Sequence, residues 1–348
     1  MMQWNEMTIF VAGGTGSFGK KFASIVLQRY RPKKLIIFSR DELKQHEMRL
    51  QLAAYESTVR FFIGDVRDHN RLHRAMQGVD IVVHAAALKQ IPSCEYNPFE
   101  AVLTNIMGSR NIIDAAIDCG VRQAILVSTD KAVNPVNLYG ATKLCAERLF
   151  VHGNAYSGAN GTRFAAVRYG NVVGSRGSVI PLFAEQRKKG YVTITDERMT
   201  RFWITLEDGV ALVIQAIQEM KGGEIFVPKL PSMSVLELAK TIARDCEIRV
   251  IGIRPGEKLH EVLISENEAR CALEFDNHFV ILSPQGWEQR ERWPGGRTLP
   301  EAFRYGSDNN TGWLEPADFE ALVNSHAELS VMLLEPDKEQ VGARLAAH

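Results

Sequence analysis

The sequence has 348 residues, of which 45% are hydrophobic and 24% charged, and its 41 Lys and Arg residues equal its 41 Asp and Glu residues. This is the composition of an ordinary globular protein with enough chain for a large core. The balanced charge and the lack of an apolar run near the roughly 18 residues of a membrane span lead us to expect neither nucleic acid nor membrane as a partner.

The five cysteines form no C-x-x-C pair, and the first predicted strand begins as early as residue 8. We therefore expect a cytoplasmic protein without a disulfide framework or a signal peptide. The nine histidines show no H-E-x-x-H or other paired spacing, so no metal site is predicted.

Short β-branched runs alternate with amphipathic, helix-length segments through the first half of the chain. This alternation predicts an α/β fold with a doubly wound parallel (Rossmann) sheet, whose ligands bind at the carboxyl ends of the strands. The predicted strands are 8–12, 34–38, 59–63, 80–84, 123–128 and 163–169. The predicted helices between them are 17–29, 42–55, 70–76, 98–119 and 139–153.

The pattern changes after Gly170 to glycine-rich loops, with further helices near 180–189, 206–220, 234–244 and 317–334. We predict a Rossmann domain at 1–170, a smaller, mainly substrate-binding α/β region at 171–334, and a tail at 335–348.

The segment VAGGTGSFGKK (11–21) follows a predicted strand and opens a predicted helix. Glycines in such a turn let the backbone approach a pyrophosphate, whose charge sits at the helix N-terminus. The segment therefore predicts a dinucleotide site that includes Gly13, Thr15, Gly16, Ser17, Phe18 and Gly19.

The end of the second strand bears on which dinucleotide is bound, because an acid there holds the ribose of NAD and an arginine suits the 2′-phosphate of NADP. The strand ends in Ser39 and Arg40, and Lys44 follows one turn into the next helix. We therefore favour NADP. In the alternative, Arg40 is merely solvated and Asp41 binds the ribose of NAD.

Three more strand ends supply cofactor candidates. Asp65 and Val66 suit a contact with the adenine edge, although Asp65 could instead cap the next helix. Ala85 and Ala86 are small enough for a cofactor to pass, although small residues there are also consistent with plain packing. The remaining cofactor candidates are Lys89, Thr104 and Ser128.

Tyr139 and Lys143 form Y-x-x-x-K, which places both side chains on one helical face. A neighbouring ammonium and a cationic nicotinamide favour the phenolate of a tyrosine, which could then take a hydroxyl proton while hydride leaves the adjacent carbon. Together with the glycine loop, this motif resembles the extended, nucleotide-sugar-modifying branch of the short-chain dehydrogenase/reductase superfamily.

Asp130 and Lys131 precede this tyrosine in STDKAVNPVNLYGATK (128–143). Oxidising a sugar at C4 makes H5 acidic, so one further base and one further acid could remove H5 and expel the 6-hydroxyl as water. The Asp-Lys pair supplies two such groups, provided that desolvation or nearby cations lower the lysine pKa. The alternative is an ordinary surface turn.

Ten segments, among them GGTGSFGK, HAAALKQ, STDKAVNPVNLYGATKLCAE, RYGNVVGSRGSV and GIRPGEKLHE, closely resemble the inverting UDP-N-acetylglucosamine 4,6-dehydratases, from about residue 8 to 282 and again at 305–316. The resemblance implies that Lys131 abstracts H5 and that Asp130 protonates the leaving hydroxyl. The implied product is UDP-2-acetamido-2,6-dideoxy-β-L-arabino-hex-4-ulose, the first intermediate of pseudaminic acid-type surface sugars, made by a homo-oligomer (dimer or hexamer) that retains NADP.

By the same resemblance, Arg176 and Arg254 face the nucleotide diphosphate and Lys89 lies near the sugar, whereas as bare residues they are solvated charges. Asn171 and Val172 follow the sixth strand, where a ligand could be held. The weaker substrate candidates are Val179, Thr193, Tyr305, Ser307 and Asn309. Two other functions stay open, a UDP-sugar 4-epimerase or reductase on this scaffold and a non-enzymatic NADP sensor.

Overall fold

The computed structural model describes residues 2–158, 161–174, 179–288 and 290–324. The chain forms two compact units. The first comprises Met1–Tyr169, Leu206–Lys229 and Val262–Tyr305, and the second comprises Gly170–Thr205, Leu230–Glu261 and Gly306–His348. The predicted tail, 335–348, lies outside the described residues.

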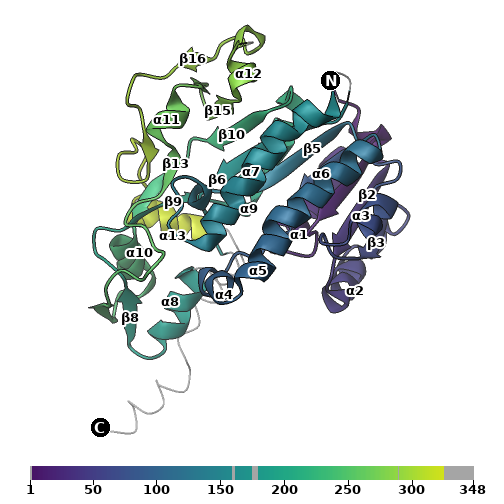
Figure 1. The fold of residues 1–348 in the computed structure, drawn as a ribbon. Coiled ribbons are helices and arrows are strands. Elements are labelled where there is room, and N and C mark those ends of the chain that lie inside the picture. The colour runs from purple at the N-terminus through teal and green to yellow at the C-terminus, as the bar shows by residue number, and fades with distance from the viewer. Residues whose placement is uncertain (1, 159–160, 175–178, 289, 325–348) are drawn as a thin grey trace. The chain divides into compact units, whose positions relative to one another are not determined.

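A single sheet is the centre of the first unit (Figure 1), and its described strands run in the order β16-β14-β15-β10-β6-β5-β4-β1-β2-β3. Their bounds are β1 (Thr8–Ala12), β2 (Lys34–Ser39), β3 (Val59–Ile63), β4 (Ile81–His84), β5 (Gln123–Thr129), β6 (Arg163–Tyr169), β10 (Glu224–Pro228), β14 (Ala272–Glu274), β15 (His278–Leu282) and β16 (Arg297–Thr298). The predicted doubly wound fold and its six strands are confirmed.

The strand order reverses at β1, which pairs in parallel with β2 on one side and β4 on the other, so that Val11 lies opposite both Ile37 and Val83. Since parallel crossovers are right-handed, the two directions of winding place helices on opposite faces of the sheet. The crevice at such a reversal is the usual ligand site of this architecture. Here it is flanked by the segments that follow β1 and β4.

The helices of the first unit are α1 (Ser17–Ile25), α2 (Glu42–Gln51), α3 (His69–Ala75), α4 (Ile91–Tyr96), α5 (Pro98–Ala101), α6 (Gly108–Asp118), α7 (Leu138–Ser157), α9 (Leu206–Glu219), α11 (Glu266–Ala269) and α12 (Pro284–Glu288). α6 packs between α3 and α7, and α1 packs against α9. The helix predicted at 98–119 is interrupted by a π-helical turn, η4 (Val102–Met107), and the one predicted at 17–29 ends in another, η2 (Val26–Tyr30).

The first segment of the first unit ends at Tyr169, and two later segments, Leu206–Lys229 and Val262–Tyr305, also belong to this unit. β10 joins the sheet in parallel beside β6, and β15 and β14 extend it with antiparallel pairing. These strands are nearly all buried and need the sheet to satisfy their backbone groups, which the local sequence pattern does not reveal.

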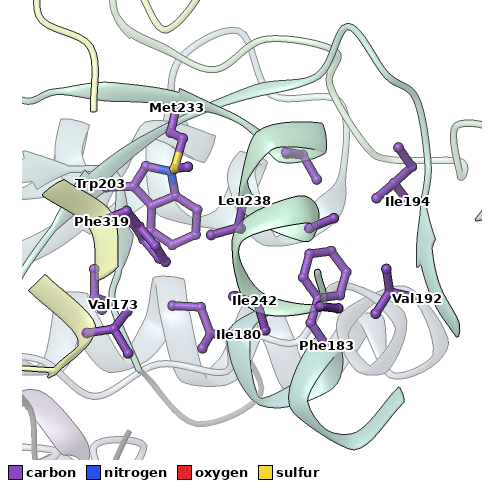
Figure 2. Packing of buried hydrophobic residues seen from close by; sticks show 14 of the residues in the cluster. Val173, Ile180, Phe183, Val192, Ile194, Trp203, Met233, Leu238, Ile242 and Phe319 are labelled. Carbon is purple, nitrogen blue, oxygen red and sulfur yellow. The ribbon is translucent and has the colours of Figure 1, made fainter. Parts of the chain in front are cut away.

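The second unit packs its helices and strands around its own core (Figure 2). Its elements are β7 (Asn171–Val172), α8 (Val179–Arg187), β8 (Tyr191–Ile194), β9 (Thr200–Ile204), β11 (Ser232–Ser234), α10 (Val235–Ile242), β12 (Glu247–Val250) and α13 (Pro316–Asn324). Trp203 meets Phe319 edge-on at 5.6 Å between ring centroids, which fixes α13 to β9. No helix in the described ranges is both long and apolar enough to cross a bilayer.

His84, the last residue of β4, is a buried imidazole beneath the crevice. Its Nε2 lies 3.1 Å from Ser109 Oγ, and the Ser109 hydroxyl donates to the Asn105 carbonyl, so the ring is the donor at Nε2. Its Nδ1 has no partner among the described residues. Burial, with a smaller contribution from the Lys143 charge, lowers the His84 pKa to about 3.

We expect this histidine to make the protein acid-sensitive. The unfolded chain takes up a proton near pH 6.5 while the folded ring stays neutral, so stability falls as the pH drops from about 6.5 toward 3. Between pH 7 and pH 5 the loss from this group should be about 2 kcal/mol. Urea unfolding of wild type and His84→Gln at both pH values measures it. Equal pH dependence in the two proteins would refute this origin.

Candidate active site

The glycine loop after β1 has a backbone that only glycine can adopt. Gly13 has φ +75°, and a Cβ placed there would lie 2.7 Å from the backbone nitrogen of Ala86, in the segment after β4. The Gly13 amide donates to the Phe38 carbonyl at 2.9 Å, which ties the loop to β2. A Cβ on Gly19 would collide with the backbone of Gly14. The loop is therefore pressed against the strand ends on both sides of the crevice.

The residues around this loop fit a dinucleotide pyrophosphate. Helix α1 begins at Ser17, and its cap residue, Gly16, has no side chain to accept from the first amides. Those N–H groups and the helix dipole favour an anion at this position. The hydroxyls of Thr104 and Ser128 are buried and lack a hydrogen-bond partner within the described chain, as expected of groups that await a ligand.

At the end of β2, Asp41 caps helix α2: its Oδ1 accepts from the Lys44 amide at 3.0 Å, and its carboxylate pairs with the Lys44 ammonium. Hydrogen bonds from Lys44 lower the Asp41 pKa. Arg40 is half exposed, and its Nη1 lies 3.6 Å from Asp65 Oδ2. Asp41 is thus engaged with its own helix, whereas Arg40 has room to turn to a phosphate.

The alternative role considered for Asp65, capping the helix after β3, is wrong. Asp68 caps α3 by accepting from the Arg71 amide at 2.9 Å. Asp65 instead accepts from Arg67 Nε and Nη2 at 2.9 and 2.7 Å. Burial alone would raise the Asp65 pKa, but these Arg67 bonds outweigh it and lower the pKa.

The Asp-Lys pair lies directly after β5, in the short turn η5 (Asp130–Ala132). Lys131 Nζ is 3.0 Å from Asp130 Oδ1, and the same oxygen accepts from the Thr129 hydroxyl at 2.9 Å. Asp130 is completely buried, and the Lys131 side chain is 23% exposed. The pair is therefore no solvated surface turn, because its carboxylate is removed from water and held by two donors.

Tyr139 is the second residue of α7, whose cap is Asn137. A Cβ on the next residue, Gly140, would collide with the Lys131 carbonyl. Glycine therefore lets the helix start directly against η5, the turn that carries the Asp130–Lys131 pair, which we call the dyad. Burial raises the Tyr139 pKa to about 12, against the charge of Lys131 and a hydrogen bond with Thr129, which lower it. Lys131 is thus a nearby positive charge that favours the phenolate of Tyr139.

Lys143 lies one turn further along α7 and is buried. Its Nζ donates to the Val127 carbonyl of β5 at 2.9 Å. Burial lowers the Lys143 pKa to about 8, and the negative charge of Glu147 opposes this effect. The lysine is thus held next to the strand end that carries Ser128 and the dyad.

Lys89 is close enough to the dyad for its charge to interact with that of Lys131. Burial, and then repulsion from Lys131, lowers the Lys89 pKa. The segment after β4 is fixed by Asn105, which accepts from the Leu88 amide at 2.8 Å and donates to the Leu88 carbonyl at 2.9 Å. Asn105 also donates to the Thr142 hydroxyl at 2.9 Å, and that hydroxyl donates to the Tyr139 carbonyl at 2.8 Å.

The sequence analysis missed Asn105 and Thr142. Both are buried polar residues in otherwise helical segments, and Asn105 lies in the π-helical turn η4. Such turns are frequent at functional sites, but amino-acid patterns do not announce them. The only signal in the sequence was an asparagine within an apolar run, in TNIMGS.

Among the substrate candidates between residues 171 and 309, Tyr305 belongs to the first unit and Arg176 lies outside the described residues. The other candidates belong to the second unit. Asn171 and Val172 form β7, and Val179 opens α8. Thr193 accepts from and donates to the Gln186 amide group, at 2.8 and 2.9 Å. Ser307 is completely buried and bonds to Thr200 and to the Glu261 amide.

Three further candidates lie near loops or strand ends. Arg254 is about half exposed, 4.0 Å from Glu257. Asn309 accepts from the Gly306 amide at 2.8 Å. Tyr305 belongs to the first unit, where its ring packs on Phe279 at 5.1 Å. The bonds within each unit give Thr193, Ser307 and Asn309 a local role, and their contact with substrate stays a prediction.

Comparison with known proteins shows the family of the chain. A family model described as polysaccharide biosynthesis protein matches residues 9–283. A Campylobacter jejuni protein named UDP-N-acetylglucosamine 4,6-dehydratase (inverting) is 48% identical over 93% of this chain and 99% of its own length. A Rickettsia canadensis protein named UDP-glucose 4-epimerase is 43% identical over 79% of this chain and 83% of its own length.

Among solved structures, the X-ray structure of Pen from Bacillus thuringiensis matches with a TM-score of 0.85 and 39% identity, over 93% of this chain and 100% of that chain. A dTDP-glucose 4,6-dehydratase from Streptomyces venezuelae has a TM-score of 0.65 at 21% identity, over 84% of this chain and 92% of that chain, and shares the fold. The chain therefore belongs to the polysaccharide biosynthesis protein family and, within it, to the group of proteins that includes the inverting UDP-N-acetylglucosamine 4,6-dehydratases.

Proposed function

We propose that the chain is a hydro-lyase that converts UDP-N-acetylglucosamine to the 4-keto-6-deoxy sugar inverted at C5. The observation that carries this proposal is the Asp130–Lys131 contact of 3.0 Å beside the buried Tyr139. The C. jejuni relative named for this reaction supports it. The product's use in pseudaminic acid-type surface sugars belongs to the proposal as well.

The cofactor in this proposal is NADP. When bound, the dinucleotide would supply hydride chemistry, as the acceptor for C4 and the donor for C6 of the sugar. The glycine loop and the N-terminus of α1 would hold the pyrophosphate, while Ser128 and Thr104 have buried hydroxyls to offer. Lys143 would orient the cofactor ribose, and Tyr139 would take the O4 proton.

Transfer of one proton within the Asp130–Lys131 pair would prepare the pair for the elimination. Asp130 as carboxylate and Lys131 as ammonium hold the same number of protons as a carboxylic acid beside a neutral amine. Moving one proton across the 3.0 Å contact thus yields both the acid and the base that are needed. Burial of Asp130 and repulsion between Lys131 and Lys89 favour the neutral pair.

The elimination then uses the neutral amine of Lys131 as the base and the carboxylic acid of Asp130 as the acid. Lys131 takes H5 as a proton, Asp130 gives its proton to the 6-hydroxyl, and the C6–O bond breaks with loss of water. The C5–C6 double bond that forms is conjugated with the 4-ketone. The dyad is left as an ion pair. Once C6 has been reduced, a proton from solvent added to the opposite face of C5 would give the inverted product, and Tyr139 would release to solvent the proton that it took from O4.

Reaction in deuterated water tests the elimination. We expect UDP-N-acetylglucosamine to lose one water and gain a deuterium at C5, with a new methyl signal in the proton NMR spectrum. Lys131→Met should lower this turnover by at least about a hundredfold, because general base catalysis is lost. Lys240→Gln, at an exposed ion pair on α10, is the control. A substrate of unchanged mass after prolonged incubation would contradict the proposal.

A 4-epimerase is the second candidate, because relatives at 43% identity carry that name. An epimerase needs Tyr139 and a dinucleotide but no additional acid–base pair at C5 and C6. In the same experiment it would invert C4 without loss of water and without deuterium at C5. Full epimerase activity in Lys131→Met would favour it over the dehydratase.

NADP preference is tested at Arg40. We expect Arg40→Ala to weaken NADP binding at least about tenfold, since a charge-assisted bond to the 2′-phosphate is lost, and to change NAD binding little. Titration of both dinucleotides by calorimetry measures the ratio. Arg74→Ala, an exposed arginine on α3, serves as the control. Equal weakening of both dinucleotides would speak against a 2′-phosphate contact.

A further inference from the structure

A cluster of buried charged side chains includes a residue of α7, the helix that carries Tyr139 and Lys143. This cluster has no role in the function proposed above. Arg168, on β6, and Glu147, on α7, are both completely buried. Arg168 donates through Nε and Nη2 to the two oxygens of Glu147, at 3.1 and 2.6 Å. This is the paired, bidentate geometry in which an arginine holds a carboxylate most firmly.

A second carboxylate completes the arginine's coordination. Glu268, the third residue of α11, accepts from Arg168 Nη2 and Nη1 at 2.9 and 3.2 Å. Arg168 Nη1 also donates to the Leu263 carbonyl of β13 (Val262–Ile264) at 2.8 Å. β13 in turn packs against η5, the turn that carries the dyad. The arginine therefore joins α7, which carries Tyr139 and Lys143, to a strand that contacts Asp130–Lys131.

Glu147 stands four residues after Lys143, so the two side chains lie on the same face of α7. Their charges attract: Glu147 opposes the effect that burial has on Lys143. The groups that face this region from other elements are the neutral His84 on β4, Arg168 on β6 and Glu268 on α11. Lys143 and Arg168 carry two positive charges, and Glu147 and Glu268 balance them.

Breaking this balance has a defined consequence. Without Glu147, Lys143 would lose the negative charge that opposes the effect of its burial, and it would release its proton more easily. Without Arg168, Glu147 would be a desolvated anion with no strong donor, and such a carboxylate takes up a proton. Either change removes the negative charge beside Lys143.

We propose that Glu147 is a positioning residue that keeps Lys143 charged beside the end of β5, and that Arg168, which Glu268 also pairs, holds the Glu147 carboxylate. The inference rests on the proposed function for the use of Lys143 in catalysis, but the charge coupling itself does not. The cost of burying Arg168 is offset by the two carboxylates that pair with it.

Titration of Lys143 tests the coupling directly. In protein labelled with ¹³C at lysine, the resonance absent from Lys143→Met identifies this residue, and its chemical shift is followed against pH. The wild-type midpoint should lie near pH 8. We expect Glu147→Gln to move it down by at least about one pH unit, while Glu147→Asp, which keeps the charge, should restore it to within about half a unit.

The matched control is Glu224→Gln. Glu224 is another buried carboxylate, on β10, and it is held by the backbone amides of Lys221 and Gly222. We expect it to leave the Lys143 midpoint unchanged. If Glu147→Gln fails to fold, Glu268→Gln is the second variant, and it should lower the midpoint by a smaller amount. A folded Glu147→Gln, or failing that a folded Glu268→Gln, with the wild-type midpoint would overturn the proposal.

Kinetics supply a separate readout. The alkaline limb of kcat should shift in Glu147→Gln by the same interval as the NMR midpoint, with the KM of the sugar nucleotide little changed. A merely structural defect would lower kcat at all pH values alike, and that outcome would also overturn the positioning role. If wild type lacks dehydratase activity but the midpoint still shifts, the proposed function fails and the charge coupling stands.

Discussion

The removal of charged groups from water at the carboxyl end of β5 is the constraint on which the rest of this site depends. Asp130 is completely buried, and Lys143 is nearly so. Charges in such a place persist only when they are paired, and their protonation responds strongly to their neighbours. Asp130 has Lys131 at 3.0 Å, and Lys143 has the field of Glu147. The segment 130–143 thus contains a buried Asp–Lys pair and a buried lysine whose pKa is lowered to about 8.

Backbone geometry also holds the segments that carry these groups close together. Gly13 permits the first loop to lie against Ala86, and Gly140 permits α7 to begin on the dyad turn. Asn105 fixes the peptide of Leu88 and, through Thr142, the start of α7. Three strand ends are therefore connected by backbone contacts and buried polar bonds, and none of these connections depends on a flexible surface side chain. A site built in this way is preorganised, which is what acid–base catalysis requires of it.

The names of the relatives point to two reactions on the same scaffold, a dehydration and a 4-epimerisation. Proteins named dehydratase and proteins named 4-epimerase both resemble this chain at more than 40% identity. In the proposed function, the glycine loop, Tyr139 and Lys143 would serve oxidation at C4 in either reaction. A dehydration also demands one acid and one base, and the buried Asp130–Lys131 pair is the proposed source of both. Fold similarity alone cannot make this distinction, because the same sheet carries many chemistries.

The sequence by itself determined the order of strands and helices through 169, the glycine-rich turn after the first strand and the positions of the Asp-Lys pair and the Y-x-x-x-K motif, since these are local patterns of periodicity and spacing. Only the tertiary structure decided that β10, β14 and β15 complete the first sheet, that Asp68 rather than Asp65 caps α3, and that Asp130 is completely buried. It also revealed the buried ion pairs of Arg168 with Glu147 and Glu268. These features depend on burial and on contacts between residues far apart in the chain, and a local pattern records neither.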